Sequence, residues 1–125
     1  MITVKDWMSK PVMTIKPNAS VHEAATTMSK HSVGSLVVSR DNKRPDGILT
    51  ERDVLRKIIA NRKDPDATKV EDIMTKKAVT VDVDTSLLEI SKIMSKNLLR
   101  RIVVTEKDKM IGIITSRDLL QLMAG

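Results

Sequence analysis

The chain is an internal duplication, and this feature constrains its fold more than any other. Residues 4–60 align with residues 70–124, first at a spacing of 66 residues and then at a spacing of 65. The identical pairs include Val4/Val70, Asp6/Asp72, Met8/Met74, Thr14/Thr80, Ser20/Ser86, Gly47/Gly112, Thr50/Thr115 and Asp53/Asp118. The change of spacing puts one extra residue into the polar run 40–46 of the first copy, where a turn tolerates it. A chain of this kind is expected to build one small unit twice.

Each copy predicts the same series of short elements. In the first copy we expect a helical turn at 4–8, a strand at 12–15, a helix at 21–28, two facing strands at 35–39 and 47–50, and a closing helix at 54–59. In the second copy we expect the helical turn at 70–74, the strand at 78–83, the helix at 87–94, the facing strands at 101–105 and 110–115, and the closing helix at 119–123. Ser20 and Ser86 are candidate N-caps, and Thr68 with Glu71 has capping-box spacing. The series β-α-β-β-α predicts an α/β (α+β) fold, with repeats at 1–60 and 70–125 and a linker at 61–69.

Composition excludes several classes of protein. The 125 residues allow one domain or two half-domains, and the lack of cysteine rules out disulfides, thiolate metal sites and a thiol nucleophile. No apolar run approaches the roughly 18 residues of a membrane span and no secretory pattern opens the chain, so a cytoplasmic protein is expected. His22 and His31 are too far apart for a metal pair, and no nucleophile motif or nucleotide-binding glycine loop occurs. We therefore expect neither a metal nor an enzyme.

The formal net charge of +6 keeps a second class of function open. A basic surface binds nucleic acid non-specifically and with salt-sensitive affinity. Against this interpretation, Lys and Arg are spread along the chain, and Trp7 is the sole aromatic residue, so no base-stacking platform is expected. A third alternative is a structural interaction module that binds other chains through its apolar helices and holds no nucleotide.

The repeated motifs resemble those of CBS domains, and two copies in tandem resemble a Bateman module. The resemblance rests on Gly-Ile-x-Thr-x-Arg-Asp at 47–53 and 112–118, on Asp-x-Met at 6–8 and 72–74, and on the order of elements. It implies a pseudo-two-fold pair that acts as a non-catalytic sensor and binds AMP, ADP or ATP between the copies, with S-adenosylmethionine or NAD also possible. It further implies a homodimer through the helices, for which the apolar runs 87–93 and 119–123 are available, and an unidentified regulated protein partner.

The resemblance implies that Thr50 with Asp53, and Thr115 with Asp118, bind the ribose of the ligand. A carboxylate at the start of a helix can accept hydrogen bonds from both ribose hydroxyls, and the helix N-terminus favours nearby anionic groups. The alternative is that both pairs are only capping boxes, and the two roles can coexist.

The same resemblance assigns an adenine slot and a phosphate site. The adenine-lining candidates are Thr14, Ile15, Ile48, Thr80, Val81 and Ile113, although strand residues in an alternating pattern are more often plain core. The phosphate candidates are Arg100 and Arg101, with His31 upstream of the matching positions in the first copy. Since Gly34 and Ser35 replace the two arginines in that copy, we expect two non-equivalent sites. The alternative is that the arginines form a solvated surface pair.

Overall fold

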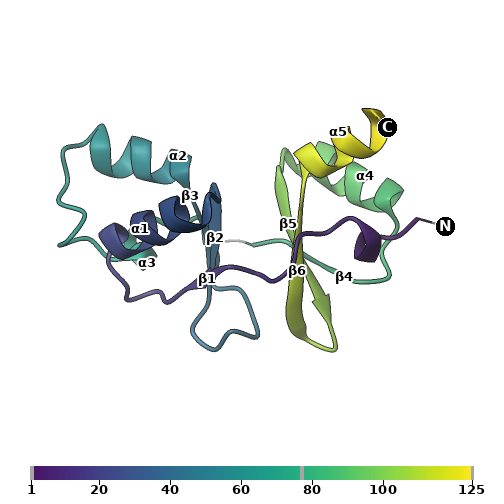
Figure 1. Ribbon diagram of the computed structural model, residues 1–125, viewed down its shortest axis with the longest axis horizontal. Helices are drawn as coiled ribbons and strands as arrows, with labels where there is room; N and C mark the ends of the chain where they lie inside the picture. Colours follow the sequence, from purple (N-terminus) through teal and green to yellow (C-terminus); the bar gives the residue numbers. More distant parts are fainter. Residues whose placement is uncertain (1, 77, 125) are drawn as a thin grey trace. The chain divides into compact units, whose positions relative to one another are not determined.

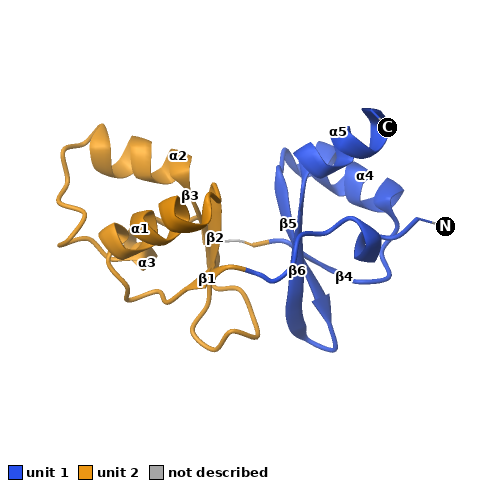
Figure 2. Ribbon diagram, in the orientation of Figure 1, with its two compact units in different colours: residues 1–12, 79–125 blue, residues 13–78 orange. Residues whose placement is uncertain are grey.

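The chain forms two compact units, each with its own sheet and core. The structure is a computed structural model that describes residues 2–76 and 78–124. Unit 2 is the continuous stretch 13–78, and unit 1 combines residues 1–12 with residues 79–125 (Figure 2). Each unit has one three-stranded sheet. The α/β fold class expected from the sequence, with one series of elements used twice, is confirmed.

Unit 2 is a sheet with helices on one of its sides (Figure 1). Its elements are β1 (Thr14–Ile15), α1 (Val21–His31), β2 (Ser35–Val38), β3 (Gly47–Thr50), α2 (Glu51–Val54), the π-helix η2 (Leu55–Ile59) and α3 (Val70–Ile73). Strand β1 runs parallel to β2, and β2 runs antiparallel to β3. Strand side chains such as Ile15, Val38 and Leu49 pack with helix side chains such as Val21 and Met28 to form the core.

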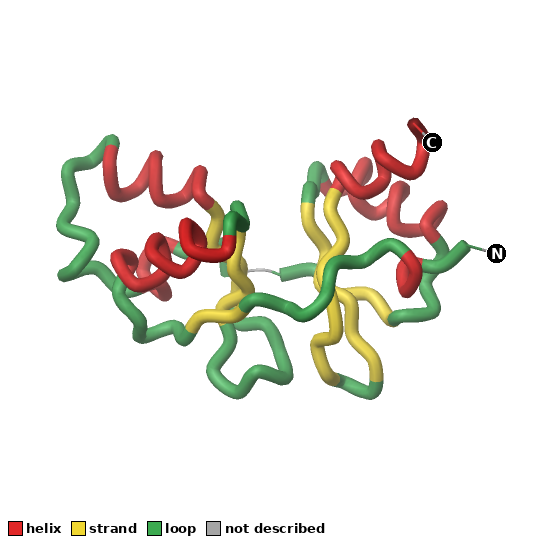
Figure 3. The backbone as a smooth tube through the Cα atoms, in the orientation of Figure 1, coloured by secondary structure: helices red, strands yellow, loops and turns green. Residues whose placement is uncertain are grey.

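Unit 1 repeats this arrangement (Figure 3). Its elements are the 3-10 helix η1 (Val4–Asp6), β4 (Thr80–Asp82), α4 (Leu87–Asn97), β5 (Arg101–Glu106), β6 (Lys109–Thr115) and α5 (Ser116–Ala124). Strand β4 is parallel to β5, and β5 is antiparallel to β6. The core includes Val4, Ile90, Ile102 and Ile114, all fully buried. Strands β1 and β4 are shorter than the sequence predicted, because only residues 14–15 and 80–82 pair with the neighbouring strand.

The two long helices begin at the serines expected to cap them. The Ser20 hydroxyl oxygen accepts the N–H of Glu23 at 3.0 Å, and that of Ser86 accepts the N–H of Glu89 at 3.2 Å. Each bond satisfies one of the N–H groups that have no partner inside a helix. Both N-cap predictions are confirmed.

The capping box expected at Thr68 and Glu71 is wrong. Helix α3 has Lys69 as its N-cap, and the Lys69 N–H donates to Asp72 at 3.3 Å. The Thr68 hydroxyl instead donates to the carbonyl of Asp64 at 2.8 Å, within the preceding turn. The spacing of Thr68 and Glu71 suits a capping box, but the threonine hydroxyl hydrogen-bonds to the backbone of the preceding turn instead of capping the helix.

The closing helices of the two units differ in their backbone. The helix expected at 54–59 forms as α2 followed directly by the π-helix η2, in which the Ala60 N–H donates to the carbonyl of Leu55 at 2.9 Å. The corresponding helix α5 is a regular α-helix. Single π-turns within a helix are uncommon and often occur near functional positions.

The segment that opens each sequence repeat packs in the unit built mostly from the other repeat. Val4 is fully buried in unit 1, and Val70 is fully buried in unit 2. Ser9 exchanges two backbone hydrogen bonds with Ile113, at 2.8 and 3.1 Å. In unit 2 the segment after α3 pairs with β3 in the same way. The boundaries of the compact units therefore differ from those of the sequence repeats.

This packing brings the two repeated motifs into contact. A Cβ added to Gly47 would lie 2.6 Å from the carbonyl oxygen of Thr75 and 2.8 Å from the sulfur of Met74. A Cβ added to Gly112 would lie 2.5 Å from the sulfur of Met8. The methionine of each Asp-x-Met motif thus lies against the glycine of a Gly-Ile motif, and the close approach requires a residue without a side chain.

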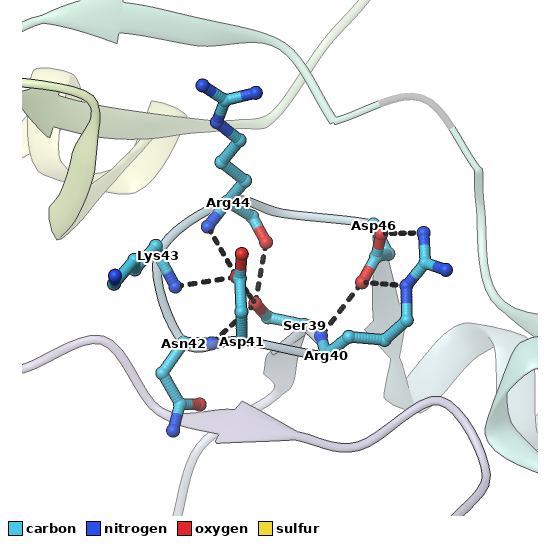
Figure 4. A network of polar contacts seen from close by, with 7 residues as sticks. All are labelled: Ser39, Arg40, Asp41, Asn42, Lys43, Arg44 and Asp46. Carbon is cyan, nitrogen blue, oxygen red and sulfur yellow. Dashed lines mark hydrogen bonds and ion pairs between the residues drawn. The ribbon is translucent and has the colours of Figure 1, made fainter.

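The polar run of the first copy is an ordered loop built around Ser39 (Figure 4). The Ser39 side chain is fully buried, and its hydroxyl donates to the carbonyl of Arg44 at 2.6 Å. The Asp41 carboxylate accepts the backbone N–H groups of Arg44 and Lys43 at 3.0 and 2.9 Å, which lowers the pKa of Asp41 below its ordinary value. Because its hydrogen bonds come from within the loop, the extra residue is accommodated without disturbing β2 or β3.

An ion pair and two contacts to β1 fix this loop further. Arg40 contacts Asp46 at 3.0 Å, and the resulting hydrogen bond lowers the pKa of the Asp46 carboxyl (Figure 4). The Thr14 hydroxyl donates to the side-chain oxygen of Asn42 at 3.1 Å, and Lys16 donates to the Arg40 carbonyl at 2.8 Å. In unit 1 the corresponding connection is a two-residue turn between β5 and β6. Among the described residues, the loop of the first copy contacts its first strand, whereas the second copy has a short turn there.

Candidate functional site

In unit 2, Thr50 and Asp53 form a complete capping box at the point where β3 becomes α2. The Asp53 N–H donates to the Thr50 hydroxyl oxygen at 3.1 Å. The Asp53 Oδ2 atom accepts both the backbone N–H of Thr50, at 3.0 Å, and the Thr50 hydroxyl, at 3.1 Å. The capping alternative that the sequence left open is thus confirmed, and it commits one carboxylate oxygen of Asp53 to the protein.

In unit 1, Thr115 and Asp118 make the same box with fewer bonds. The Thr115 N–H donates to Asp118 Oδ2 at 2.8 Å, and the Asp118 N–H donates to the Thr115 hydroxyl oxygen at 3.2 Å. Within residues 2–76 and 78–124, the Thr115 hydroxyl donates no hydrogen bond and Asp118 Oδ1 accepts none. A half-buried carboxylate oxygen and a hydroxyl proton are therefore available to a ligand at this point.

The second carboxylate oxygen of Asp53 is not available in the same way. Lys57 Nζ lies 3.5 Å from Asp53 Oδ1, and the Asp53 side chain is only 13% exposed. Lys57 also donates to the backbone carbonyl of Ile73 at 2.7 Å. The sequence analysis did not single out Lys57. The signal for it was the repeat alignment, in which the residue that matches Lys57 is the apolar Leu122.

In each unit, strand pairing puts two of the adenine candidates on the same sheet face as the threonine of the Thr–Asp pair, Thr50 or Thr115. Thr14 pairs with Val37, which pairs with Ile48, and Thr50 lies two residues further along β3. Residues that pair across strands, or lie two apart along one strand, share a face. This face of unit 2 is opposite to the one that carries Val38 and Leu49, which point into the core.

Unit 1 has the same arrangement. Thr80 pairs with Val103, Val103 pairs with Ile113, and Thr115 follows two residues later on β6. Thr80 is exposed, whereas the Thr14 hydroxyl donates a hydrogen bond to the loop residue Asn42. The two faces are thus built alike but differ at their first strand.

The other two adenine candidates belong to the hydrophobic cores. Ile15 is 9% exposed and is a member of the unit 2 core cluster, and Val81 packs against the core cluster of unit 1. In the strand alternation each lies one residue after its threonine, so its side chain points to the opposite face. For these two residues the structure favours the plain core interpretation.

The two arginine candidates lie beside the free Thr115–Asp118 pair. Arg101 is the direct cross-strand partner of Thr115, an arrangement that puts their Cβ atoms roughly 4.5–5.5 Å apart. The carbonyl of Arg100 accepts the N–H of Ser116, the first residue of α5, at 2.9 Å. Arg100 is exposed and Arg101 is half-buried. Both arginine residues thus lie next to the N-terminus of a nine-residue helix, Arg100 through its backbone and Arg101 through its strand pairing.

The matching place in unit 2 has the opposite charge. Gly34 accepts the N–H of Glu51 at 3.0 Å, and the Glu51 carboxylate lies 3.2 Å from where a Cβ on Gly34 would be. Ser35 is the cross-strand partner of Thr50. His31 ends α1 and is exposed. The alignment of the two repeats predicted the loss of the two arginines in the first repeat. It did not predict Glu51, which makes this position of unit 2 acidic.

Other candidate chemistry is sparse in the part of the chain that the structure describes. Over residues 2–76 and 78–124, no group of three or more His, Cys, Asp or Glu side chains is placed to hold a metal ion. Across the same residues, no helix combines the length and the apolar character needed to cross a membrane. The Thr–Asp pairs and their surroundings are therefore the best-developed candidate sites.

The fold and the motifs define a class of protein that the family comparison identifies. Residues 4–60 and residues 70–125 each match the model of the CBS domain family. Because these matches cover most of the chain, the protein belongs to the CBS domain family and has two CBS repeats in tandem. The resemblance inferred from the Gly-Ile-x-Thr-x-Arg-Asp motif is confirmed.

Individual relatives and solved structures are similar to this chain. An uncharacterized protein of Methanopyrus kandleri, MK0525, is 35% identical over 121 residues, which are 96% of this chain and 62% of that protein. The crystal structure of an uncharacterized conserved protein from Pyrococcus horikoshii has a TM-score of 0.86 at 35% identity, covering 99% of this chain and 93% of that one. The CBS domain pair of protein MJ0100, in complex with 5′-methylthioadenosine and S-adenosyl-L-methionine, has a TM-score of 0.87 at 30% identity, covering 100% and 98%.

Proposed function

We propose that this protein is a non-catalytic regulatory module that binds an adenosine-containing ligand with an anionic group, and that the site lies in unit 1 at Thr115 and Asp118. The observation that carries the proposal is the open carboxylate oxygen of Asp118, whose capping partner Thr115 at the end of β6 is the cross-strand partner of Arg101. The MJ0100 domain pair, which binds two adenosine derivatives, supports the ligand class.

Each part of such a ligand has a chemical counterpart in unit 1. Asp118 Oδ1 can accept a hydrogen bond from a ribose hydroxyl, and the Thr115 hydroxyl can donate one. Arg100 and Arg101 can bind phosphate oxygens at the N-terminus of α5, where the helix dipole also favours an anion. Thr80 and Ile113 lie on the same sheet face and are available to the adenine ring. AMP, ADP and ATP combine all three parts.

Binding would act by mass action rather than by turnover. A ligand that binds only the folded module stabilises it by an amount that grows with the ratio of ligand concentration to Kd. A ligand with different affinities for two conformations or assembly states shifts the population between them. A protein partner that recognises one of these states would then respond to the ligand.

The test is a thermal-shift and calorimetric titration of the wild-type chain with AMP, ADP, ATP, S-adenosylmethionine and NAD. We expect one of these ligands to bind and Asp118→Ala to abolish its binding. Asp53→Ala is the matched control, because it removes an equivalent capping carboxylate and costs a similar ~1 kcal/mol of stability. Absence of binding by all five ligands would refute the proposal. Salt-sensitive binding of a duplex oligonucleotide would then support the nucleic-acid alternative.

We also propose that the protein forms a homodimer through its helices. Among the apolar residues expected to form a helical interface, Leu87 and Ile90 are buried, whereas Leu88, Leu120 and Met123 are 66%, 65% and 82% exposed. Exposed apolar side chains that cluster on helices are typical of association surfaces. Light scattering at micromolar concentration should give a dimer mass for the wild type and a lower mass for Leu120→Glu/Met123→Glu. A monomeric wild type would contradict this proposal.

A further inference from the structure

Lys57 has no charged counterpart in the other repeat. In the repeat alignment its counterpart is Leu122, which packs against the hydrophobic cluster of unit 1. The Lys57 side chain is 44% exposed, and its amine extends between the π-helix and α3. It contacts two acceptors there, the Ile73 carbonyl at 2.7 Å and Asp53 Oδ1 at 3.5 Å. Ile58 fills the core of unit 2 at this turn, so the first repeat has a cation beside its Thr–Asp pair without giving up a core residue.

The Lys57 amine lies next to Oδ1, the carboxylate oxygen of Asp53 that a ligand would need. The capping box uses Oδ2, and Lys57 lies next to Oδ1, so both carboxylate oxygens have protein partners. A ribose hydroxyl is a neutral donor, whereas the Lys57 amine, 3.5 Å from Oδ1, attracts the carboxylate as a charge even without a hydrogen bond. Because the Asp53 side chain is only 13% exposed and the amine lies beside Oδ1, a ribose hydroxyl would have to displace Lys57 to reach this oxygen. Asp118 has no such competitor within the described residues.

A second contact keeps Lys57 in this position. Its bond to the Ile73 carbonyl is short, and Ile73 itself is buried in the unit 2 core. The amine therefore has a hydrogen bond to the last residue of α3 that does not involve Asp53. The hydroxyl of Thr50 also donates to Asp53, which further reduces what the pair can offer to a ligand.

We propose that Lys57 closes the Thr50–Asp53 pair to nucleosides, so that the chain is a single-site module whose binding specificity between the repeats is set by this lysine. The proposal rests on the function proposed above in the choice of ligand class. It adds that non-equivalence of the repeats comes from a residue outside the shared motif, and that removing one amine restores the second site.

Lys57→Leu is the informative variant, because leucine is the residue that unit 1 tolerates at this position. Lys57→Met provides a second variant that removes the charge and keeps an unbranched side chain, in case leucine does not fit beside the π-helix. The reciprocal change, Leu122→Lys, tests the same idea in unit 1. A double variant, Lys57→Leu/Asp53→Ala, shows whether any new binding uses Asp53. Circular dichroism of each variant checks that it is folded.

The measurement is calorimetric titration with AMP and with ADP. We expect Lys57→Leu or Lys57→Met to bind one equivalent more than the wild type, or to bind at least about tenfold more tightly at the first repeat, and Asp53→Ala to remove that gain. Leu122→Lys should weaken binding that depends on Asp118. No gain in either folded Lys57 variant, or a gain that survives Asp53→Ala, would overturn the inference.

The outcomes separate this inference from the function on which it rests. The wild type and Asp118→Ala alone decide whether unit 1 binds a nucleotide. The gain on removing Lys57 decides whether the lysine closes the first repeat, and it can appear even if the wild type binds nothing. Weaker binding in the Lys57 variants would mean that the amine is a ligand contact, and it would refute the inference.

Discussion

Substitution of Gly47 by alanine tests the close approach between β3 and the segment after α3. The added Cβ would lie 2.6 Å from the Thr75 carbonyl oxygen, which belongs to the backbone and cannot rotate away. It would also lie 2.8 Å from the sulfur of Met74. The Thr75 segment must therefore move away from β3, and the two hydrogen bonds between Ile48 and Thr75, both 2.9 Å long, are weakened or lost.

The expected loss can be estimated from these contacts. Two backbone hydrogen bonds contribute about 1 kcal/mol each, and overpacking of a tight site costs ~1–3 kcal/mol. The lower conformational entropy of alanine in the unfolded chain offsets about 0.4–1 kcal/mol of this. We expect Gly47→Ala to lower the free energy of unfolding by roughly 2–4 kcal/mol, a large part of the ~5–15 kcal/mol typical of a domain.

The other glycines provide matched controls. In Gly112→Ala the closest atom is the flexible end of Met8, and the nearest backbone atom, the Ser9 carbonyl oxygen, lies at 3.0 Å. We expect a smaller loss of about 1–2 kcal/mol, which Met8→Ala should partly relieve. In Gly34→Ala the nearest atom is the Glu51 carboxylate at 3.2 Å, so stability should change by no more than about 0.5 kcal/mol.

The assay is equilibrium unfolding in urea, with the midpoint and the slope compared among the three variants. An unchanged slope would show that the midpoints report stability rather than a change in the unfolded state. The reasoning is refuted if Gly47→Ala unfolds at the same urea concentration as the wild type, or if Gly34→Ala is the most destabilised of the three.

Two further predictions concern a strained residue and a titrating one. Leu98 ends α4 in the left-handed conformation, with a φ of 54°, and is 90% exposed. Because asparagine tolerates this conformation better than leucine, Leu98→Asn should stabilise the chain by ~0.5–1 kcal/mol. An unchanged or lower melting temperature would contradict this prediction. The bond from Arg40 lowers the pKa of Asp46 in the folded chain, so its stabilisation is present above the unfolded pKa of about 4 and lost as pH falls through the lower folded value. Asp46→Asn should therefore be less stable than the wild type at pH 7 and equal to it near pH 2, and urea midpoints that differ equally at both pH values would argue against the ion pair.

Local patterns in the sequence were sufficient to predict most elements of the fold. The serine caps of α1 and α4 and the facing strands on either side of each turn were correct, because capping and β-branched runs act within a few residues. Because the chain is duplicated, each element was predicted from two stretches of the sequence. The error at Thr68 arose where two local hydrogen-bonding choices compete and spacing alone does not decide between them.

The features that the sequence did not predict depend on contacts distant along the chain. The anchoring of Lys57 on Ile73 depends on where α3 packs, and no periodicity reports that. The exchange of the opening segments is invisible for a related reason, because Val4 and Val70 are identical and would suit either core. The duplication that makes the elements easy to predict thus hides which copy each segment belongs to. For Ile15 and Val81, the pattern gave the alternation of side chains but not the face that meets the helices.

The exchange of opening segments has a consequence for the order in which the chain can fold during synthesis. Unit 2 is continuous, so it can form once the ribosome has released residue 78. The segment around Val4 and Ser9 is made before unit 2, yet its partner Ile113 lies on β6 and is made after unit 2. Residues 4–9 must therefore remain unpaired while unit 2 forms, until β6 has been synthesised. The slowest step in folding is expected to be this closure, because it joins segments that are far apart in the sequence.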